Sequence, residues 1–293
     1  MRHPDQQNFS SSVTEISRGN TAHMNLNKLT AEKRAQILNL LVEGNSLQTA
    51  SRYSDTPFRI CENLLADVGT ALSAYQDCML RNRTWKHIQI NEVWSFVYAK
   101  RKSISTAERQ DLVHGDAWTW IATDDDTKFV ISWLVGGRDA AYAIAFVDAL
   151  RPRLANRVQL ASDGRLVCLK AVEGAFERDV DYARLVERYG AVPENDRVRF
   201  EGHPTQVRAG HAERGNIAPR IGIRRFGSLT NAFSKKVKSH AHAVTLHYMH
   251  YNFCRIHKKP RETPAIAAGL ADRLWGINDI LRVLEDWEAT VAG

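Results

Sequence analysis

The sequence has few cysteines, no long apolar run and almost no acidic residues over one stretch of its last third. Its four cysteines are far apart and form no C-x-x-C pair, which argues against a zinc ribbon or a disulfide framework and fits a reducing cytoplasm. No apolar run approaches the roughly 18 residues of a membrane span, so no membrane partner is expected. Residues 1–24 are polar and lack the apolar core of a signal peptide. They are predicted to be a disordered tail, with Met24 as a second candidate start.

The overall composition predicts a folded, basic protein. The chain has 293 residues, of which 44% are hydrophobic, enough for one large domain and a small one with a real core. The net charge of +7 and the pI near 9.3 favour an anionic partner.

The positive charge is concentrated in residues 213–261, which contain eleven Lys or Arg residues and a single acid, Glu213. Apolar residues recur at steps of three and four from Leu229 to Tyr251, which predicts a long amphipathic helix. Its exposed side would be basic and suited to a phosphate backbone. The alternative is a solvated helix whose charges only keep it soluble, but such helices usually mix both signs.

Residues 25–80 predict three helices. Thr30 and Gly44 bound the first, Ser46 opens the second, and Pro57 is placed as the first residue of the third. Short connections make this a candidate helix-turn-helix DNA-binding domain. The third helix would enter the major groove with a set of four side chains, Thr56, Arg59, Glu62 and Asn63. An ordinary helical bundle used for dimerisation is the alternative.

The middle of the chain alternates between strand and helix patterns. Residues 86–99 form the strongest strand pattern, and residues 117–122 and 129–135 predict a hairpin across 123–127. The three aspartates of that turn are read as turn formers rather than as a catalytic group. Residues 138–150 predict a helix.

A short apolar strand, residues 158–161, runs into Ser162-Asp163-Gly164 and a helix at 166–176. An acid at the carboxyl end of such a strand is a usual place for chemistry in an α/β sheet, although a helix-capping aspartate is equally natural there. Residues 181–186 are a possible further strand, and 188–210 read as a long loop. This order is that of an α/β, RNase H-like domain, in which carboxylates from the first strand, the fourth strand and a late helix hold two divalent metals.

Several blocks in this order resemble the catalytic blocks of bacterial DDE transposases, in particular the group typified by insertion sequence one. They are Asn91 to Val97, Gly136 to Asp139, Ser162 to Gly164, Glu213 to Asn216, Thr230 to Lys236 and Tyr251 to His257. The match runs from about Leu29 to Gly269. The resemblance implies an RNase H-like domain over 85–262, preceded by the helix-turn-helix domain and followed by a helical tail at 263–293.

The same resemblance implies a catalytic triad at Asn91, Asp163 and Glu213, with Asp163 and Glu213 as ligands of Mg²⁺, for which Mn²⁺ can substitute. It also implies double-stranded DNA as partner (terminal inverted repeats and target DNA), a homodimer, and a place in the bacterial cytoplasm beside the nucleoid. The predicted DNA contacts are Arg59, Asn63, Arg224, Arg225, Lys235, Lys236, Lys238, Arg255, His257 and Lys258.

Asn91 departs from the family, which has aspartate at this position. An amide offers one neutral oxygen and two protons that would face the cations. Changing a residue that only contacts a metal ligand often weakens metal binding about 10–100-fold, so the loss of a charged ligand itself should weaken it at least as much. Glu92 should point to the opposite face of the strand, and Asp116 is a weaker rescue candidate. Pro219 and Gly222 predict a short or broken helix after Glu213.

The function is therefore left open between two main classes. The first is a DNA transposase that cleaves and rejoins phosphodiesters, impaired by Asn91. The second is a DNA-binding protein without cleavage activity that represses or inhibits active transposases. An RNA- or hybrid-cleaving nuclease is less favoured, because it needs no duplex sequence reader. The tail at 263–293 is expected either to pack on the domain or to serve self-association.

Overall fold

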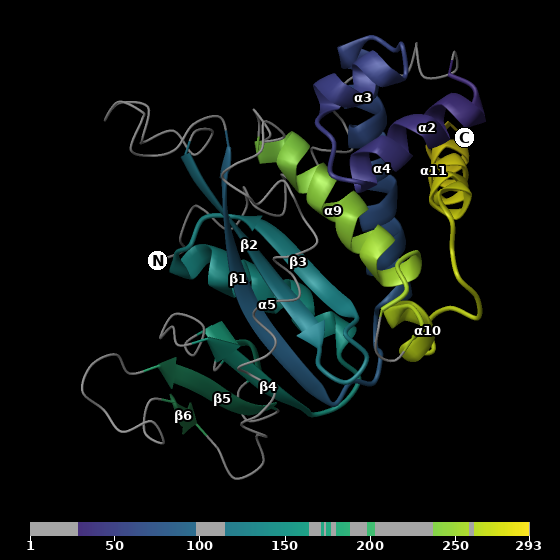
Figure 1. Ribbon diagram of the computed structural model, residues 1–293. Coiled ribbons are helices and arrows are strands. Elements are labelled where there is room, and N and C mark those ends of the chain that lie inside the picture. Colours follow the sequence, from purple (N-terminus) through teal and green to yellow (C-terminus); the bar gives the residue numbers. More distant parts are fainter. Residues whose placement is uncertain are drawn as a thin grey trace.

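The structure is a computed structural model, and it describes residues 29–97, 115–163, 171–172, 174–176, 180–187, 198–202, 237–257 and 261–292. It begins with three helices, α2 (Ala31–Val42), α3 (Leu47–Tyr53) and α4 (Phe58–Met79) (Figure 1). The side chains of Thr30 and Ser46 accept backbone N–H groups at the starts of α2 and α3, as predicted. Pro57 is the residue before α4 rather than its first helical residue.

A six-stranded mixed sheet forms the centre of the molecule. Its strands are β1 (His87–Val97), β2 (Gly115–Asp124), β3 (Val130–Gly136), β4 (Val158–Asp163), β5 (Val180–Glu187) and β6 (Val198–Gly202). They lie in the order β3-β2-β1-β4-β5-β6. β1 pairs antiparallel with β2 and parallel with β4, while β5 is parallel to β4 and antiparallel to β6. The predicted α/β class is confirmed.

Two expectations for the second half of the sheet have different outcomes. The possible strand at 181–186 is present as β5. The stretch at 188–210, expected to be loop throughout, contains β6, so that expectation is wrong for Val198–Gly202. Among the described strands β6 pairs with β5 alone, and this pairing stabilises a five-residue strand whose sequence is too short to predict it. Of the helix expected at 166–176, residues 171–172 and 174–176 are described, and they are helical.

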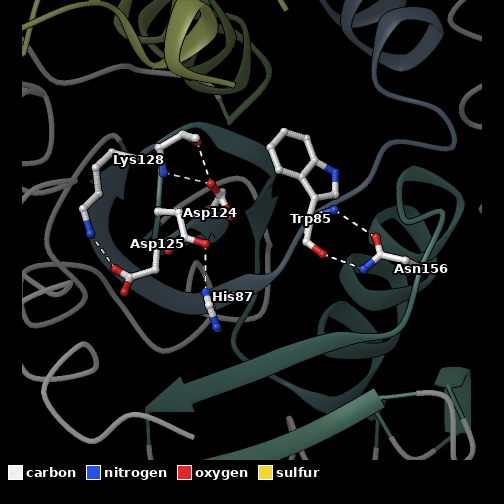
Figure 2. Close-up of polar contacts among 8 residues, drawn as sticks. Trp85, His87, Asp124, Asp125, Lys128 and Asn156 are labelled. Carbon is white, nitrogen blue, oxygen red and sulfur yellow. Dashed lines mark hydrogen bonds and ion pairs between the residues drawn. The ribbon is translucent and has the colours of Figure 1, made fainter. Parts of the chain in front are cut away.

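The three aspartates in the turn between β2 and β3 all form contacts within the turn or with His87. The Asp124 carboxylate accepts the N–H and the hydroxyl of Thr127, at 2.9 and 2.6 Å. Asp125 contacts the Lys128 ammonium at 2.5 Å (Figure 2), and its N–H donates to the His87 carbonyl. Asp126 lies 2.8 Å from the His87 ring. The three aspartates therefore shape the turn, as predicted.

Helices cover both faces of the sheet. α5 (Ala140–Leu150), capped by Asp139, packs on β2 and β3, where the Phe146 ring lies 6.0 Å from the Trp120 ring. α9 (Val237–Phe253) lies on the opposite face, where Val244, Tyr248 and Tyr251 pack against strand residues such as Val93. On its other side α9 contacts α4, so it lies between the sheet and α4 (Figure 1).

The position of α9 corrects the prediction of a basic amphipathic helix. Within Val237–Phe253 the one Lys is Lys238, and ten of the seventeen residues are buried, including His240 and Asn252. The helix is buried because its polar residues are mainly histidines and small hydroxyl residues, which can be enclosed when they find partners. The remainder of the basic region, 213–236 and 258–260, lies outside the described residues.

The C-terminal helices pack against α2, α4 and α9. α10 (Pro264–Ala267) contacts α9, and α11 (Ile277–Ala292) packs on α4 and α2 through Ile280, Leu281 and Leu284. The Arg34 guanidinium on α2 contacts the Glu288 carboxylate on α11 at 3.1 Å. The tail was expected either to pack on the domain or to serve self-association, and α11 packs on α2 and α4. No helix among the described residues is both long and apolar enough to cross a membrane.

Candidate functional site

Asn91 and Asp163 stand on neighbouring strands at the centre of the sheet. The parallel ladder between β1 and β4 ends with the pair Ile90 and Ser162, so Asn91 and Asp163 are the next residues of the two strands. Asp163 is also the last residue of β4 and pairs with Leu185 of β5. The topology therefore brings together two of the three residues predicted for the catalytic triad. Glu213, the third, and the side chain of Asp163 lie outside the described residues.

Asn91 belongs to the face of the sheet that α9 covers. It pairs with Ile121 on β2, and Val93 and Ser95 follow on the same face because side chains alternate along a strand. Asn91 is only 7% exposed, and its Nδ2 atom has no hydrogen-bond partner among the described residues. Further along, the Ser95 hydroxyl lies 3.1 Å from Nε2 of His240 on α9. Asn91 is therefore buried, and the described residues offer its Nδ2 atom no hydrogen-bond partner.

Glu92 faces the other way, as predicted. Its carboxylate is fully buried and forms an ion pair with Nε of Arg138, which lies between β3 and α5. The Arg138 guanidinium stacks over the Trp118 ring, with 3.7 Å between its central carbon and the ring centroid. Glu92 is therefore engaged in a compensated pair on the opposite face, and it does not replace the missing carboxylate at position 91.

Asp116 lies far from Asn91 along the ladder. It pairs with Phe96, whereas Asn91 pairs with Ile121. Five residues of β-strand separate the two pairs, or about 17 Å at about 3.4 Å per residue. This separation argues against Asp116 as a substitute ligand.

Of the three residues predicted at the metal site, Asn91 is the one whose side chain is described, and its chemistry fits a divalent cation only in part. Mg²⁺ prefers oxygen ligands and accepts amide carbonyl oxygens, so Asn91 can supply a ligand but no charge. Among the described residues, which exclude Glu213 and the Asp163 side chain, no three His, Cys, Asp or Glu side chains gather into a metal site.

Three of the predicted DNA contacts lie near one another at the start of α4 and α9. Arg59 is exposed and Asn63 half-buried on the first two turns of α4, and Lys238 is exposed on the first turn of α9. The two helix starts are joined by a hydrogen bond from the Ser239 hydroxyl to the Glu62 carboxylate at 3.3 Å.

Two side chains expected in the major groove are not free to enter it. Thr56 is 4% exposed, and its hydroxyl donates to the Ser54 carbonyl. Glu62 is held against α9 by Ser239. The expectation for Thr56 and Glu62 is therefore wrong, because the turn before α4 and the packing of α9 use these side chains. Arg59 and Asn63 remain candidates.

Arg255 and His257 lie after the other end of α9. The seventeen residues of this helix span about 25 Å, so these two residues do not share a surface with Lys238. The His257 ring meets the Tyr251 ring edge-on at 4.5 Å. Burial and the neighbouring Arg255 charge lower the pKa of His257, which favours its neutral form. Arg224, Arg225, Lys235, Lys236 and Lys258 lie outside the described residues.

Asn252 is a residue whose role the sequence did not predict. Its fully buried side chain accepts the N–H of Val130 and donates to the carbonyl of Val130, both at 2.9 Å. These bonds fix the end of α9 to the start of β3. The Tyr251-Asn252-Phe253 motif thus has a structural function, which is visible only once the partner strand is known.

Comparison with known proteins gives distant structural similarities. No protein-family model matches the chain, and no curated protein sequence matches it. The strand transfer complex of Mos1 is 15% identical with a TM-score of 0.22, over 60% of this chain and 63% of that one, so less than two thirds of that protein is spanned. The synaptic complex of piggyBac transposase with hairpin DNA is 10% identical with a TM-score of 0.38, over 92% and 74%. A pre-cleavage Mos1 transpososome is 10% identical with a TM-score of 0.22, over 84% and 86%. These scores are too low to establish a common fold.

Proposed function

We propose that the chain is a DNA transposase of the DDE type whose cleavage activity is impaired by Asn91. The observation that carries this proposal is the adjacency of β1 and β4, which makes Asn91 and Asp163 neighbours at the centre of the sheet. A site built from the first and fourth strands requires these strands to lie side by side. The ordered sequence blocks that resemble bacterial insertion-sequence transposases support the same function.

In this proposal Asp163 and Glu213 hold Mg²⁺, or Mn²⁺ in its place, and Asn91 stands where the third carboxylate belongs. Bound divalent ions in such sites activate a water or 3′-hydroxyl and stabilise the leaving oxygen of a phosphodiester. The role of Asn91 would be to place a neutral carbonyl oxygen beside Asp163. Its buried Nδ2 atom is a further disadvantage, because its protons would repel a cation in a site that excludes water.

The proposed DNA-binding part comprises α2 to α4 as a helix-turn-helix, with Arg59 and Asn63 at the start of α4 and Lys238 beside them. The exposure of Arg59 and Lys238, and the position of all three residues around two adjacent helix starts, support a contact with one duplex. The partners would be the terminal inverted repeats and the target DNA, with a homodimer pairing two ends. Arg224, Arg225, Lys235, Lys236, Arg255, His257 and Lys258 remain proposed phosphate contacts.

The test is binding of the purified full chain to a duplex carrying the repeats that flank its own gene, compared with a shuffled duplex of equal length. Specific proteins of this kind bind their site about 10³-fold or more tightly than other sequences at physiological salt. We expect a clear preference for the repeats and a loss of that preference in Asn63→Ala, with Asn278→Ala on exposed α11 as the matched control. Equal affinity for both duplexes would contradict the proposal.

A second candidate is a non-cleaving inhibitor of active transposases. Asn91 favours it, because a buried amide without a hydrogen-bond partner among the described residues persists more easily in a protein that no longer binds metal. Co-expression with an active relative on a mixed donor plasmid should then lower transposition frequency. An unchanged frequency would count against inhibition and leave the impaired enzyme.

A further inference from the structure

Six basic residues gather at the end of the sheet where β1 and β4 begin. They come from two segments far apart in sequence, residues 81–86 between α4 and β1 and residues 151–157 between α5 and β4. We call these segments the basic loop pair. Its cationic members are Arg81, Arg83, Lys86, Arg151, Arg153 and Arg157.

The basic loop pair is held in one arrangement by its backbone. The N–H of Asn82 donates to the Pro152 carbonyl at 3.0 Å, and the N–H of Ala155 donates to the Arg83 carbonyl at 2.8 Å. The Asn156 side chain accepts the N–H of Trp85 at 2.9 Å and donates to the Trp85 carbonyl at 2.7 Å (Figure 2). Because the backbone of both loops is already ordered, ligand binding costs only the ordering of the exposed side chains.

Arg153 anchors the pair to the sheet and is not one of the ligand contacts. It is 8% exposed, and its Nη1 atom donates to the Ile131 carbonyl of β3 at 2.6 Å. Burial lowers the pKa of its guanidinium. The Trp85 indole donates to the Arg153 carbonyl at 3.3 Å, so the anchor holds both segments.

The exposed charges of the pair are only partly compensated. Arg81 contacts Asp77 at 2.6 Å, and Arg157 contacts Asp181 at 2.5 Å. Arg83, Lys86 and Arg151 are exposed and form no ion pair within the described part of the chain. The result is a local excess of positive charge.

Arg83 and Arg151 stand on different segments of the basic loop pair, and each has one contact that orients its guanidinium group. Arg83 Nε donates to the Met79 carbonyl at 2.9 Å, which fixes the base of its guanidinium. Arg151 lies over the Phe176 ring, 5.4 Å from its centroid. Arg151 also lines an open hollow of about 520 Å³, together with Asn82, Asn156, Arg157 and Asp148. Uncompensated guanidinium groups, amide donors and an open hollow suit a phosphate group rather than an apolar ligand.

We propose that the basic loop pair is a second site for the phosphate backbone of duplex DNA, separate from the Asn91 and Asp163 position. This inference rests on the proposed function. Lys86 precedes Asn91 by five residues of extended chain, about 17 Å, which is about half a helical turn of B-DNA. A duplex at the central strands thus presents further phosphates at the distance of these loops.

The test is the salt dependence of binding between the full chain and a labelled duplex of unrelated sequence, followed by fluorescence anisotropy. Each lost phosphate contact lowers the slope of log affinity against log salt by about 1. We expect Arg83→Ala and Arg151→Ala each to lower the slope by about 1. The double variant should bind roughly 30-fold more weakly at about 0.15 M salt. Arg282→Ala, which removes an exposed arginine from α11, is the matched control and should leave the slope unchanged.

A second variant separates phosphate contact from folding. The double change to lysine keeps both charges but loses the guanidinium geometry, so it should recover most of the slope if the side chains bind phosphate. An unchanged slope in the alanine double variant would overturn the second site alone, provided the wild-type chain still prefers the terminal repeats. Absence of any wild-type duplex binding would overturn both proposals. If the alanine double variant lost affinity for single-stranded RNA but bound duplex DNA as the wild type does, the second duplex site would also be overturned.

Discussion

Asn91 and Glu92 are consecutive residues of β1 that lie on opposite faces of the sheet, and the two faces differ in the partners that they offer a buried polar side chain. Glu92 is fully buried but is paired with Arg138, which in turn stacks on Trp118. Asn91 is buried under the α9 side of the sheet, and its Nδ2 atom has no partner among the described residues. On the Glu92 face, the charge of the carboxylate is balanced by an arginine of the same chain. On the other face, a carboxylate would need a cation from outside, which is what a metal site provides.

The largest effect is expected from removing the cation on the Glu92 face. Arg138→Met should destabilise the protein by about 3 kcal/mol, because it leaves the buried Glu92 carboxylate without its charge partner. Urea unfolding measures the change, with Arg282→Met on the exposed side of α11 as control. A loss equal to that of the control would mean that Glu92 has sufficient other partners.

The second largest loss of stability is expected from weakening the attachment of α9 to the sheet on the Asn91 face. Asn252→Ala should cost about 2 to 3 kcal/mol, because the N–H and carbonyl of Val130 lose their buried partner. Asn278→Ala, at an exposed position of α11, should change stability by less than about 0.5 kcal/mol. If the two variants unfold at the same urea concentration, α9 is not held by Asn252.

A smaller effect is expected where α9 touches α4. A Cβ atom added at Gly69 would lie 2.8 Å from the Cα of His242, a backbone atom that cannot move alone. Gly69→Ala should therefore cost about 1 to 2 kcal/mol despite its better helix propensity. Gly174→Ala is the control, since its added Cβ meets nothing within 4 Å and should stabilise a helical residue by up to about 1 kcal/mol. Thermal melting of both variants should shift in opposite directions.

The smallest effect concerns pH. Burial lowers the pKa of His242 and of His250 on α9 below the ordinary value of 6.5. The unfolded chain therefore takes up protons at a higher pH than the folded one, so their contribution to stability is present above about pH 6.5 and is lost as the pH falls. Urea midpoints at pH 7.5 and 5.5 should show this decline, and His250→Gln should reduce it. A decline of the same size in the variant would exclude His250 as its source.

Sequence reasoning succeeded where periodicity is local and failed where partners come from far away. The alternation of apolar and polar residues in 86–99 predicted β1. It also predicted that Glu92 and Asn91 lie on opposite faces of the sheet, because side chains alternate along any strand. The burial of α9 was missed because His240 and Asn252 count as polar until Ser95 and Val130 are known as their partners. The basic loop pair could not be predicted either, since its two segments are far apart in sequence and meet only in the folded chain, through hydrogen bonds such as that from Asn82 to Pro152.

The most direct test of the central claim is strand cleavage by the wild-type chain and by Asn91→Asp, each with and without Mg²⁺, on a duplex carrying the element's ends. We predict Mg²⁺-dependent cleavage by Asn91→Asp that exceeds the wild-type rate by at least about 10–100-fold. Mg²⁺ should also raise the melting temperature of the variant more than that of the wild type, because the new carboxylate gains its missing cation. Equal cleavage by both proteins would contradict the assignment of Asn91 as the residue that limits this site.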